Sequence, residues 1–131
     1  MVTASGRAAV AFSLSGGDRH DAPEGELLIG GLKRLPEQLF ILMDWAWEGE
    51  KMREKAACKG FVPVVPPKRD RREPWEYDKE RYKKRNEDER FFLRLKRFRK
   101  IFTRHDKLDV VYAGFIYFAM AADALFSVNR L

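Results

Sequence analysis

Four side chains of types that can do chemistry on phosphates share one face of a predicted helix. They are Tyr82, Arg85, Glu89 and Lys96, spaced 3, 4 and 7 residues apart. At about 100° per residue, all four fall within roughly 60° of one another. A glutamate held between cations on a docked helix can bind a hard metal ion beside a polyanion. The spacing therefore predicts a site for phosphate chemistry on this helix.

One long helix is predicted to position these four side chains. Asp78 is the expected N-cap residue, and the helical pattern continues to about Arg99. Phe91, Leu95 and Phe98 recur at i, i+4 and i+7, which makes a separate apolar stripe. We expect this stripe to dock the helix on a hydrophobic core.

Shorter elements complete the predicted order of strands and helices. The predicted strands are Ala8–Leu14, Leu39–Met43 and Phe61–Val65, and the other predicted helices are Glu24–Leu35, Glu48–Lys59 and Leu108–Val128. Met1–Arg7 is small and polar, and we expect it to be frayed. Strands that alternate with helices are typical of the α/β class. We predict an α/β fold with about three short strands, which ends in a long basic helix and an apolar C-terminal helix.

The second predicted strand is the best placed to present a functional residue. Leu39–Met43 is a continuous apolar run, which is typical of a strand buried on both faces, and Asp44 follows it directly. Open α/β sheets bind their ligands at the carboxyl ends of strands, so Asp44 is a candidate ligand. Gly60 is the expected stop of the following helix, and Pro63 restricts the third strand to a sheet edge.

The positive charge of the chain is concentrated in one region. The net charge is +6 and the pI is about 9.6, but Lys68–Lys107 alone has 17 Lys and Arg against 9 Asp and Glu. A basic region of this kind favours an acidic partner, and DNA is the leading candidate. Four cations are interpreted as a phosphate-binding loop, and the alternative is a solubilising loop: Lys68, Arg69, Arg71 and Arg72. Trp75 beside them is a candidate for stacking on a base.

Cysteine content and hydropathy limit the remaining classes. Cys58 is the only cysteine, so no intramolecular disulfide or cysteine-rich zinc site is expected, and a reducing compartment fits. The uncharged apolar run Val110–Ala122 is too short to span a bilayer, and Asp123 closes it. We therefore expect a cytoplasmic protein with no membrane or small-molecule partner, and we interpret the apolar C-terminal helix as largely buried.

The pattern Tyr82-x2-Arg85-x3-Glu89-x6-Lys96 resembles the Y-R-E-K signature of DDE-type insertion-sequence transposases of the IS-five kind. Three longer stretches also resemble these enzymes: Val64–Leu108, Phe12–Gly25 and Leu42–Arg53. Asp88 departs from the family pattern, which usually has an apolar residue there. If Asp88 faces the core, it is a buried charge that costs several kcal/mol or forces repacking.

The resemblance implies a function for each motif residue. It implies an RNase H-like fold, of which residues 1–131 are the C-terminal portion of the catalytic domain, and Mg²⁺-dependent DNA cleavage and strand transfer. Asp44 and Glu89 match the second aspartate and the glutamate of the catalytic triad, and they are the implied ligands of a two-magnesium site. Arg85, Lys96 and Tyr82 match residues that contact DNA. From the residues alone, Asp44 as a helix N-cap, Arg85 paired with Glu89, and Tyr82 as a packing residue remain alternatives.

The first aspartate of the triad has no match in these residues. We do not expect two carboxylates to hold two metal ions in register, so the chain alone is expected to be inactive. It is then one half of a frameshifted enzyme or a decayed remnant, and the alternative is a non-enzymatic DNA-binding fragment that modulates a full-length transposase. The expected partners are DNA, an upstream transposase half and the chain itself, in the cytoplasm near the nucleoid.

Overall fold

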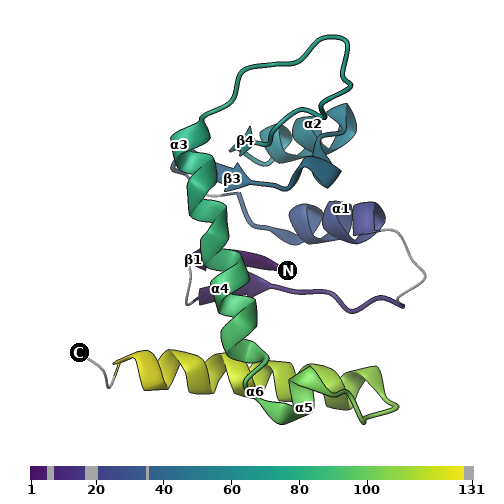
Figure 1. Ribbon diagram of the computed structural model, residues 1–131, viewed down its shortest axis with the longest axis vertical. Helices are drawn as coiled ribbons and strands as arrows, with labels where there is room; N and C mark the ends of the chain where they lie inside the picture. The colour runs from purple at the N-terminus through teal and green to yellow at the C-terminus, as the bar shows by residue number, and fades with distance from the viewer. Residues whose placement is uncertain (6–7, 17–20, 35, 129–131) are drawn as a thin grey trace. The chain divides into compact units, whose positions relative to one another are not determined.

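The computed structural model describes residues 1–5, 8–16, 21–34 and 36–128 (Figure 1). The chain divides into two compact units. Unit 1 consists of Met1–Leu14 and Asn86–Leu131, and unit 2 consists of Ser15–Arg85. Both units mix helices with short strands, which agrees with the α/β class at a coarse level. We describe each unit by itself.

Unit 2 contains a parallel pair of strands connected by a helix. Its elements are α1 (Asp21–Gly31), β3 (Leu39–Leu42), the 3₁₀ helix η1 (Trp45–Trp47), α2 (Glu50–Cys58), β4 (Phe61–Val64), α3 (Lys79–Tyr82) and the 3₁₀ helix η2 (Lys83–Arg85). The register of the pair runs from Leu39 opposite Phe61 to Leu42 opposite Val64. Parallel strands need a crossover, and η1 with α2 provides it. Both strands lie within their predicted ranges.

The crossover helix α2 ends where the sequence predicts. Gly60 has a φ of 85°, and its N–H donates to the carbonyl of Ala57 at 2.9 Å. Only glycine adopts this conformation without strain, so Gly60 is the expected stop. Met52 and Ala56, one turn apart, are buried in the core of unit 2 together with Ile29, Met43 and Val65.

Two predictions for unit 2 need correction. The predicted helix Glu24–Leu35 is α1, which starts three residues earlier and ends at Gly31. The prediction that Leu39–Met43 is buried on both faces is wrong, because Leu39 and Phe40 are exposed. An apolar strand is buried on both faces only when layers cover both sides of its sheet, and β3 belongs to a sheet of two strands, β3 and β4.

Unit 1 joins the start of the chain to its last third. Its elements are the antiparallel strands β1 (Val2–Ser5) and β2 (Ala8–Ala11), followed by α4 (Asn86–Leu95), α5 (Arg99–Phe102) and α6 (Asp109–Val128). The prediction that Met1–Arg7 is frayed is wrong for residues 2–5, since β2 provides the hydrogen-bond partners that order β1. The predicted strand Ala8–Leu14 is shortened to β2.

The predicted helix Asp78–Arg99 is three helices in succession. Asp78 is the N-cap of α3, as predicted, because its carboxylate accepts the N–H of Arg81 at 2.9 Å. The 3₁₀ helix η2 follows, and α4 then starts with three acidic residues in its first turn, which favour a helix N-terminus. A 3₁₀ helix turns each residue by about 120°, so Tyr82 and Arg85, three residues apart, stay on the same side of the chain across η2. The helix also ends at Leu95, before Lys96.

The predicted docking stripe forms the core of unit 1. Phe91 and Leu95 are buried on α4 against Ala119 of α6, and Phe98 packs at the edge of this cluster. The apolar stripe therefore does what its spacing predicts.

The prediction that α6 is largely buried is wrong. Only Ile116 and Ala119 are buried among its residues with described burial, and large apolar side chains along the helix are exposed. The apolar run that Asp123 closes is part of a longer helix, because α6 continues to Val128. By length and composition alone, the 19-residue segment Asp109–Ser127 is apolar enough to cross a membrane.

Candidate functional site

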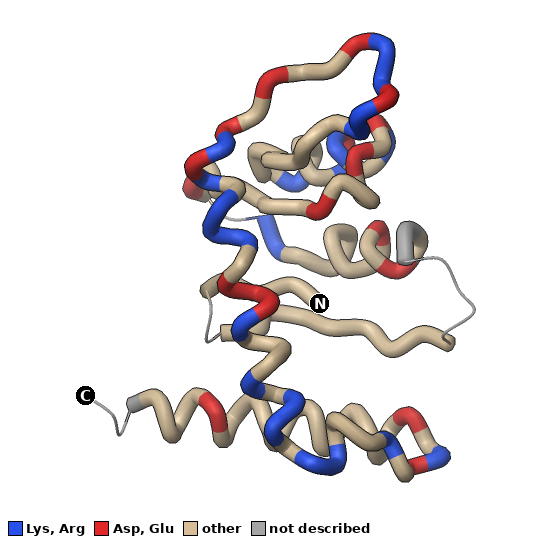
Figure 2. The backbone as a smooth tube through the Cα atoms, in the orientation of Figure 1, with Lys and Arg blue, Asp and Glu red and all other residues tan. Residues whose placement is uncertain are grey.

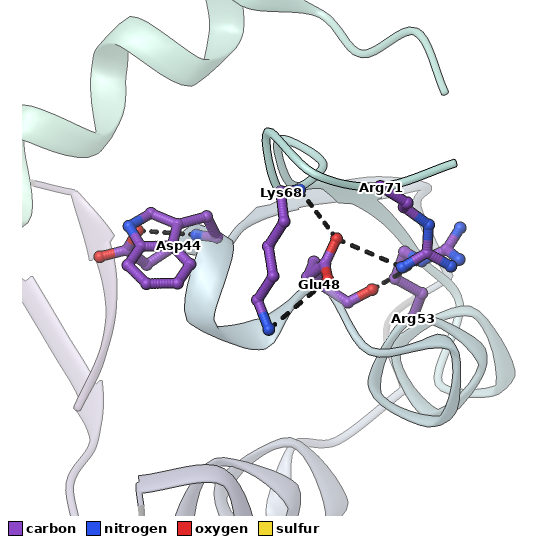
Figure 3. Close-up of polar contacts among 6 residues, drawn as sticks. Asp44, Glu48, Arg53, Lys68 and Arg71 are labelled. Atoms are coloured by element: carbon purple, nitrogen blue, oxygen red, sulfur yellow. Dashed lines mark hydrogen bonds and ion pairs between the residues drawn. The ribbon is translucent and has the colours of Figure 1, made fainter. Parts of the chain in front are cut away.

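Unit 2 places Asp44 directly after the carboxyl end of β3. The N–H of Met43 still bonds to the carbonyl of Val64 at 3.0 Å, and the chain then turns into η1. One oxygen of Asp44 accepts the N–H of Trp45 at 2.7 Å, so Asp44 caps η1 (Figure 3). The other oxygen lies 3.6 Å from Nη1 of Arg85. The N-cap role, one of the sequence alternatives, is thus confirmed for Asp44.

Tyr82 lies beside this ion pair. The guanidinium of Arg85 is 5.6 Å from the centre of its ring, and Tyr77 contacts the same ring edge-on at 5.6 Å. Burial has the largest effect on the pKa of Tyr82 and raises it. The charge of Arg85 has the next largest effect and lowers the pKa, and the charge of Asp44 raises it. The phenol therefore remains a neutral hydrogen-bond donor near pH 7. The fold thus brings Asp44 together with Tyr82 and Arg85, which lie much later in the sequence.

A second cluster in unit 2 surrounds a carboxylate that the sequence analysis did not single out. Glu48 is 7% exposed, and its Oε2 accepts the N–H of Lys68 at 3.0 Å and a bond from Nη1 of Arg71 at 3.3 Å. The ammonium of Lys68 lies 3.7 Å from Oε1. Arg53 donates to the backbone carbonyl of Glu48 at 3.2 Å. Figure 3 shows these contacts, and we call Glu48, Arg53, Lys68 and Arg71 the Glu48 cluster.

Two of the four cations of the predicted phosphate-binding loop, Lys68 and Arg71, are held by Glu48. The backbone bond from Lys68 is the main cause of a lowered pKa of Glu48, the burial of Glu48 opposes it, and the charges of Arg71 and Lys68 lower it further. Glu48 is therefore ionised near pH 7 and pairs with two of the four cations. Arg69 and Arg72 are exposed on the same loop. Figure 2 shows cationic and acidic residues alternating along it.

Trp75 is part of the same loop structure. Its indole N–H donates to the carbonyl of Val65 at 2.9 Å. The guanidinium groups of Arg53 and Arg71 lie 3.9 and 4.5 Å from the centre of its ring. A base that stacked on Trp75 would compete with these contacts.

Unit 1 contains the remaining predicted site residues. Glu89 is exposed in the first turn of α4, and Lys96 is exposed in the turn that follows this helix. Asp88 is half-buried and accepts a hydrogen bond from the hydroxyl of Thr3 on β1. The departure from the transposase pattern at Asp88 is therefore accommodated by a hydroxyl donor, which reduces the cost of burying the charge.

Among the described residues, no three acidic, histidine or cysteine side chains converge on a point that could hold a metal ion. Asp44 belongs to unit 2 and Glu89 to unit 1. Around Asp44, unit 2 offers one carboxylate, whose oxygens already contact Trp45 N–H and Arg85. A two-magnesium site needs several carboxylate oxygens. Unit 2 taken by itself does not fit such a site.

The sequence analysis did not single out Glu48 because the residues that bind its carboxylate, Lys68 and Arg71, lie at least twenty residues later in the chain. The available signal was a glutamate between an apolar strand and a helix, followed later by a run of cations. That combination identifies a candidate pair only if the fold brings the two segments together.

No protein-family model matches the chain, and no curated protein or solved structure matches it.

Proposed function

We propose that this chain is the C-terminal portion of a DDE-type transposase, with a partial RNase H-like fold, that binds DNA through its phosphates in the nucleoid of the cytoplasm. One observation carries the proposal. Asp44, Tyr82 and Arg85, which the resemblance assigns to one site, lie together after the carboxyl end of β3. That end of a parallel strand pair is where α/β sheets bind ligands.

The residues of this chain would bind and orient the DNA strand. Arg69 and Arg72 on the loop and Lys96 after α4 are exposed cations that can contact phosphate oxygens. In the complete enzyme, Asp44 and Glu89 would contribute ligands for magnesium, which supplies activation of the attacking oxygen and stabilisation of the leaving oxygen.

A salt titration tests DNA binding. The affinity of the full chain for a labelled duplex is measured by fluorescence anisotropy from about 50 to 200 mM salt, and log K should fall steeply with log salt. Replacing Arg69 and Arg72 with alanine should reduce the slope by about 2, because each phosphate contact contributes about 0.9. The control replaces Lys33 and Arg34, an exposed pair of equal charge in unit 2. Equal losses in both double variants, or no salt dependence, would contradict the loop assignment.

A plasmid-nicking assay tests the catalytic part. The chain is assayed with Mg²⁺ alone and also joined to the product of the reading frame immediately upstream. We expect nicking by the joined protein, and we expect it to disappear in Asp44→Asn and in Glu89→Gln. Circular dichroism and duplex binding check that both variants are folded.

The second candidate is a DNA-binding fragment without catalysis. It is favoured by the pairing of Asp44 with a cation, Arg85, in unit 2. A joined protein that binds DNA with the expected salt slope but never nicks it would support this candidate over the first. Nicking that persists in Glu89→Gln would contradict the assignment of Glu89 as a metal ligand.

A further inference from the structure

Helix α6 has an inner face that is fixed to the rest of unit 1. Ile116 and Ala119 are buried, and Ala119 belongs to the core cluster with α4. The hydroxyl of Tyr112 donates to the carbonyl of Ile101 at 3.1 Å. Asp123 accepts bonds from Nε of Arg94 at 3.1 Å with both carboxylate oxygens. The polar groups of the inner face thus have hydrogen-bond partners within unit 1, and its apolar side chains are buried there.

The opposite side of α6 has a regular apolar seam. Its members are exposed and spaced 3, 4, 3 and 4 residues apart: Val111, Gly114, Phe118, Ala121 and Leu125. We call these five residues the outer seam. This alternation of three and four is the spacing of the a and d positions at which two helices pack together.

The outer seam has a hollow next to a large side chain. A Cβ built on Gly114 would have no neighbour within 4 Å. Val111, Gly114, Phe115 and Phe118 line a shallow, open depression of about 410 Å³ at this point. Phe118 lies one turn further along the helix and is 67% exposed. The aromatic ring of Phe118 and the open space over Gly114 therefore lie next to each other on the same face of α6.

This arrangement is complementary to itself. Consider an antiparallel pair whose two-fold axis crosses the outer seam at the level of residue 116 along the helix. Phe118 of one copy then faces Gly114 of the other. The same axis places Val111 opposite Ala121. Phe118 and Val111 then each meet a smaller residue, twice over, as an isologous interface requires, whereas Leu125 has no seam residue opposite it. Antiparallel helices also align their dipoles favourably.

We propose that the outer seam of α6 is a homodimer interface, in which two copies of this chain pack antiparallel with Phe118 over Gly114. The helix is about 30 Å long, and an aromatic side chain buries about 150–250 Å² when fully covered. The seam therefore covers a few hundred Å² per copy, below the ~800 Å² per partner of a standard interface. The dimer should therefore be weak and transient.

A lipid bilayer is the competing occupant, because α6 passes a length and composition test for a membrane span. Insertion would separate the inner face from α4 and place Asp123 in hydrocarbon without Arg94. An ionised carboxylate in hydrocarbon is unfavourable. A second copy covers the seam and leaves the inner face unchanged, so the observations favour it over the bilayer.

Sedimentation velocity of the full chain, from low-micromolar to several-hundred-micromolar concentration, tests the proposal. We expect a concentration-dependent dimer that weakens at least tenfold in Phe118→Glu. Gly114→Leu, which fills the hollow, should weaken it similarly. The matched control is Phe102→Glu in α5, where the phenylalanine is 69% exposed but lies outside the seam. Circular dichroism shows whether each variant is folded.

Cross-linking tests the orientation. In a Cys58→Ser background, which removes the exposed free thiol, Val111→Cys combined with Ala121→Cys should form a covalent dimer on mild oxidation. Val111→Cys alone should not, since it would face its own copy only in a parallel pair. A chain that stays monomeric at every concentration overturns the proposal. So does a dimer insensitive to Phe118→Glu, a loss of equal size in Phe102→Glu, or a monomer that co-floats with phosphatidylcholine vesicles.

Discussion

The Glu48 cluster of unit 2 and the outer seam of α6 in unit 1 differ in whether their side chains have partners within the chain. In the cluster, a buried carboxylate has a donor or a cation at each oxygen. In the seam, Val111, Phe118 and Leu125 remain exposed. A buried charge without partners would prevent folding, whereas an exposed apolar side chain costs little until another surface can cover it. Changes in the cluster should therefore affect folding, and changes in the seam should affect association.

The largest expected difference separates two phenylalanines of unit 1. Phe91 is 0% exposed and Phe118 is 67% exposed. Phe91→Ala removes a buried ring and leaves a cavity, so it should lower the free energy of unfolding by about 3–5 kcal/mol. Phe118→Ala should change it by less than about 0.5 kcal/mol. Urea unfolding at concentrations below the dimer Kd measures both, and similar losses would mean that the seam is buried in the folded monomer.

The Glu48 cluster should give a pH-dependent effect on folding. The pKa of Glu48 is lower in the folded chain than in the unfolded chain, so its ionisation stabilises the fold near pH 7. This contribution disappears as the pH falls through the acid range, where Glu48 takes up a proton.

Glu48→Gln lacks this contribution at every pH. Its urea midpoint should be clearly below that of the unchanged chain near neutral pH, and the difference should shrink towards about pH 3. Glu50→Gln, an exposed change in α2, is the control. A constant difference across the pH range would show that the glutamate acts through packing.

Two ion pairs of α6 should differ in strength. Asp123 is 14% exposed and pairs with Arg94, whereas Asp109 is 74% exposed and pairs with Arg104. Asp123→Asn should lower the free energy of unfolding by about 1–3 kcal/mol, because it leaves a partly buried guanidinium without its counter-charge. Asp109→Asn should cost about 0.2–1 kcal/mol. Equal effects in a urea titration would argue against a fixed inner face of α6.

The sequence predicts well what depends on neighbours along the chain. The cap at Asp78, the stop at Gly60 and the docking stripe through Phe91 follow from local chemistry and periodicity, and all are confirmed. The break at η2 had a local signal too, since the acidic run from Glu87 to Glu89 marks a new helix start.

What the sequence missed depends on contacts between distant segments. Strand β1 requires β2 as its partner, and Glu48 requires a loop twenty residues away. An apolar helix such as α6 is buried only if enough elements surround it, which its own pattern does not determine. In the candidate site, the pairing of Asp44 with Arg85 likewise follows from the fold and not from either segment.

The smallest expected effect concerns the cap of α3, which supports Tyr82 beside Arg85. Asp78 accepts the N–H of Arg81, and this bond is the main cause of its lowered pKa. Asp78→Ala removes the acceptor and should speed hydrogen exchange at the Arg81 amide. Asp78→Asn keeps an acceptor oxygen and should leave exchange nearly unchanged.

How far along the chain the faster exchange of Asp78→Ala extends would show whether the helices of the two units open separately. The 3₁₀ helix η2 interrupts the α-helical hydrogen bonds between α3 and α4, and α4 has its own acidic first turn and its own buried stripe. Faster exchange in Asp78→Ala should therefore stop before the amides of α4. If those amides also exchange faster, then α3, η2 and α4 open as one cooperative helix, and a change in unit 2 is transmitted to the helix on which unit 1 is built.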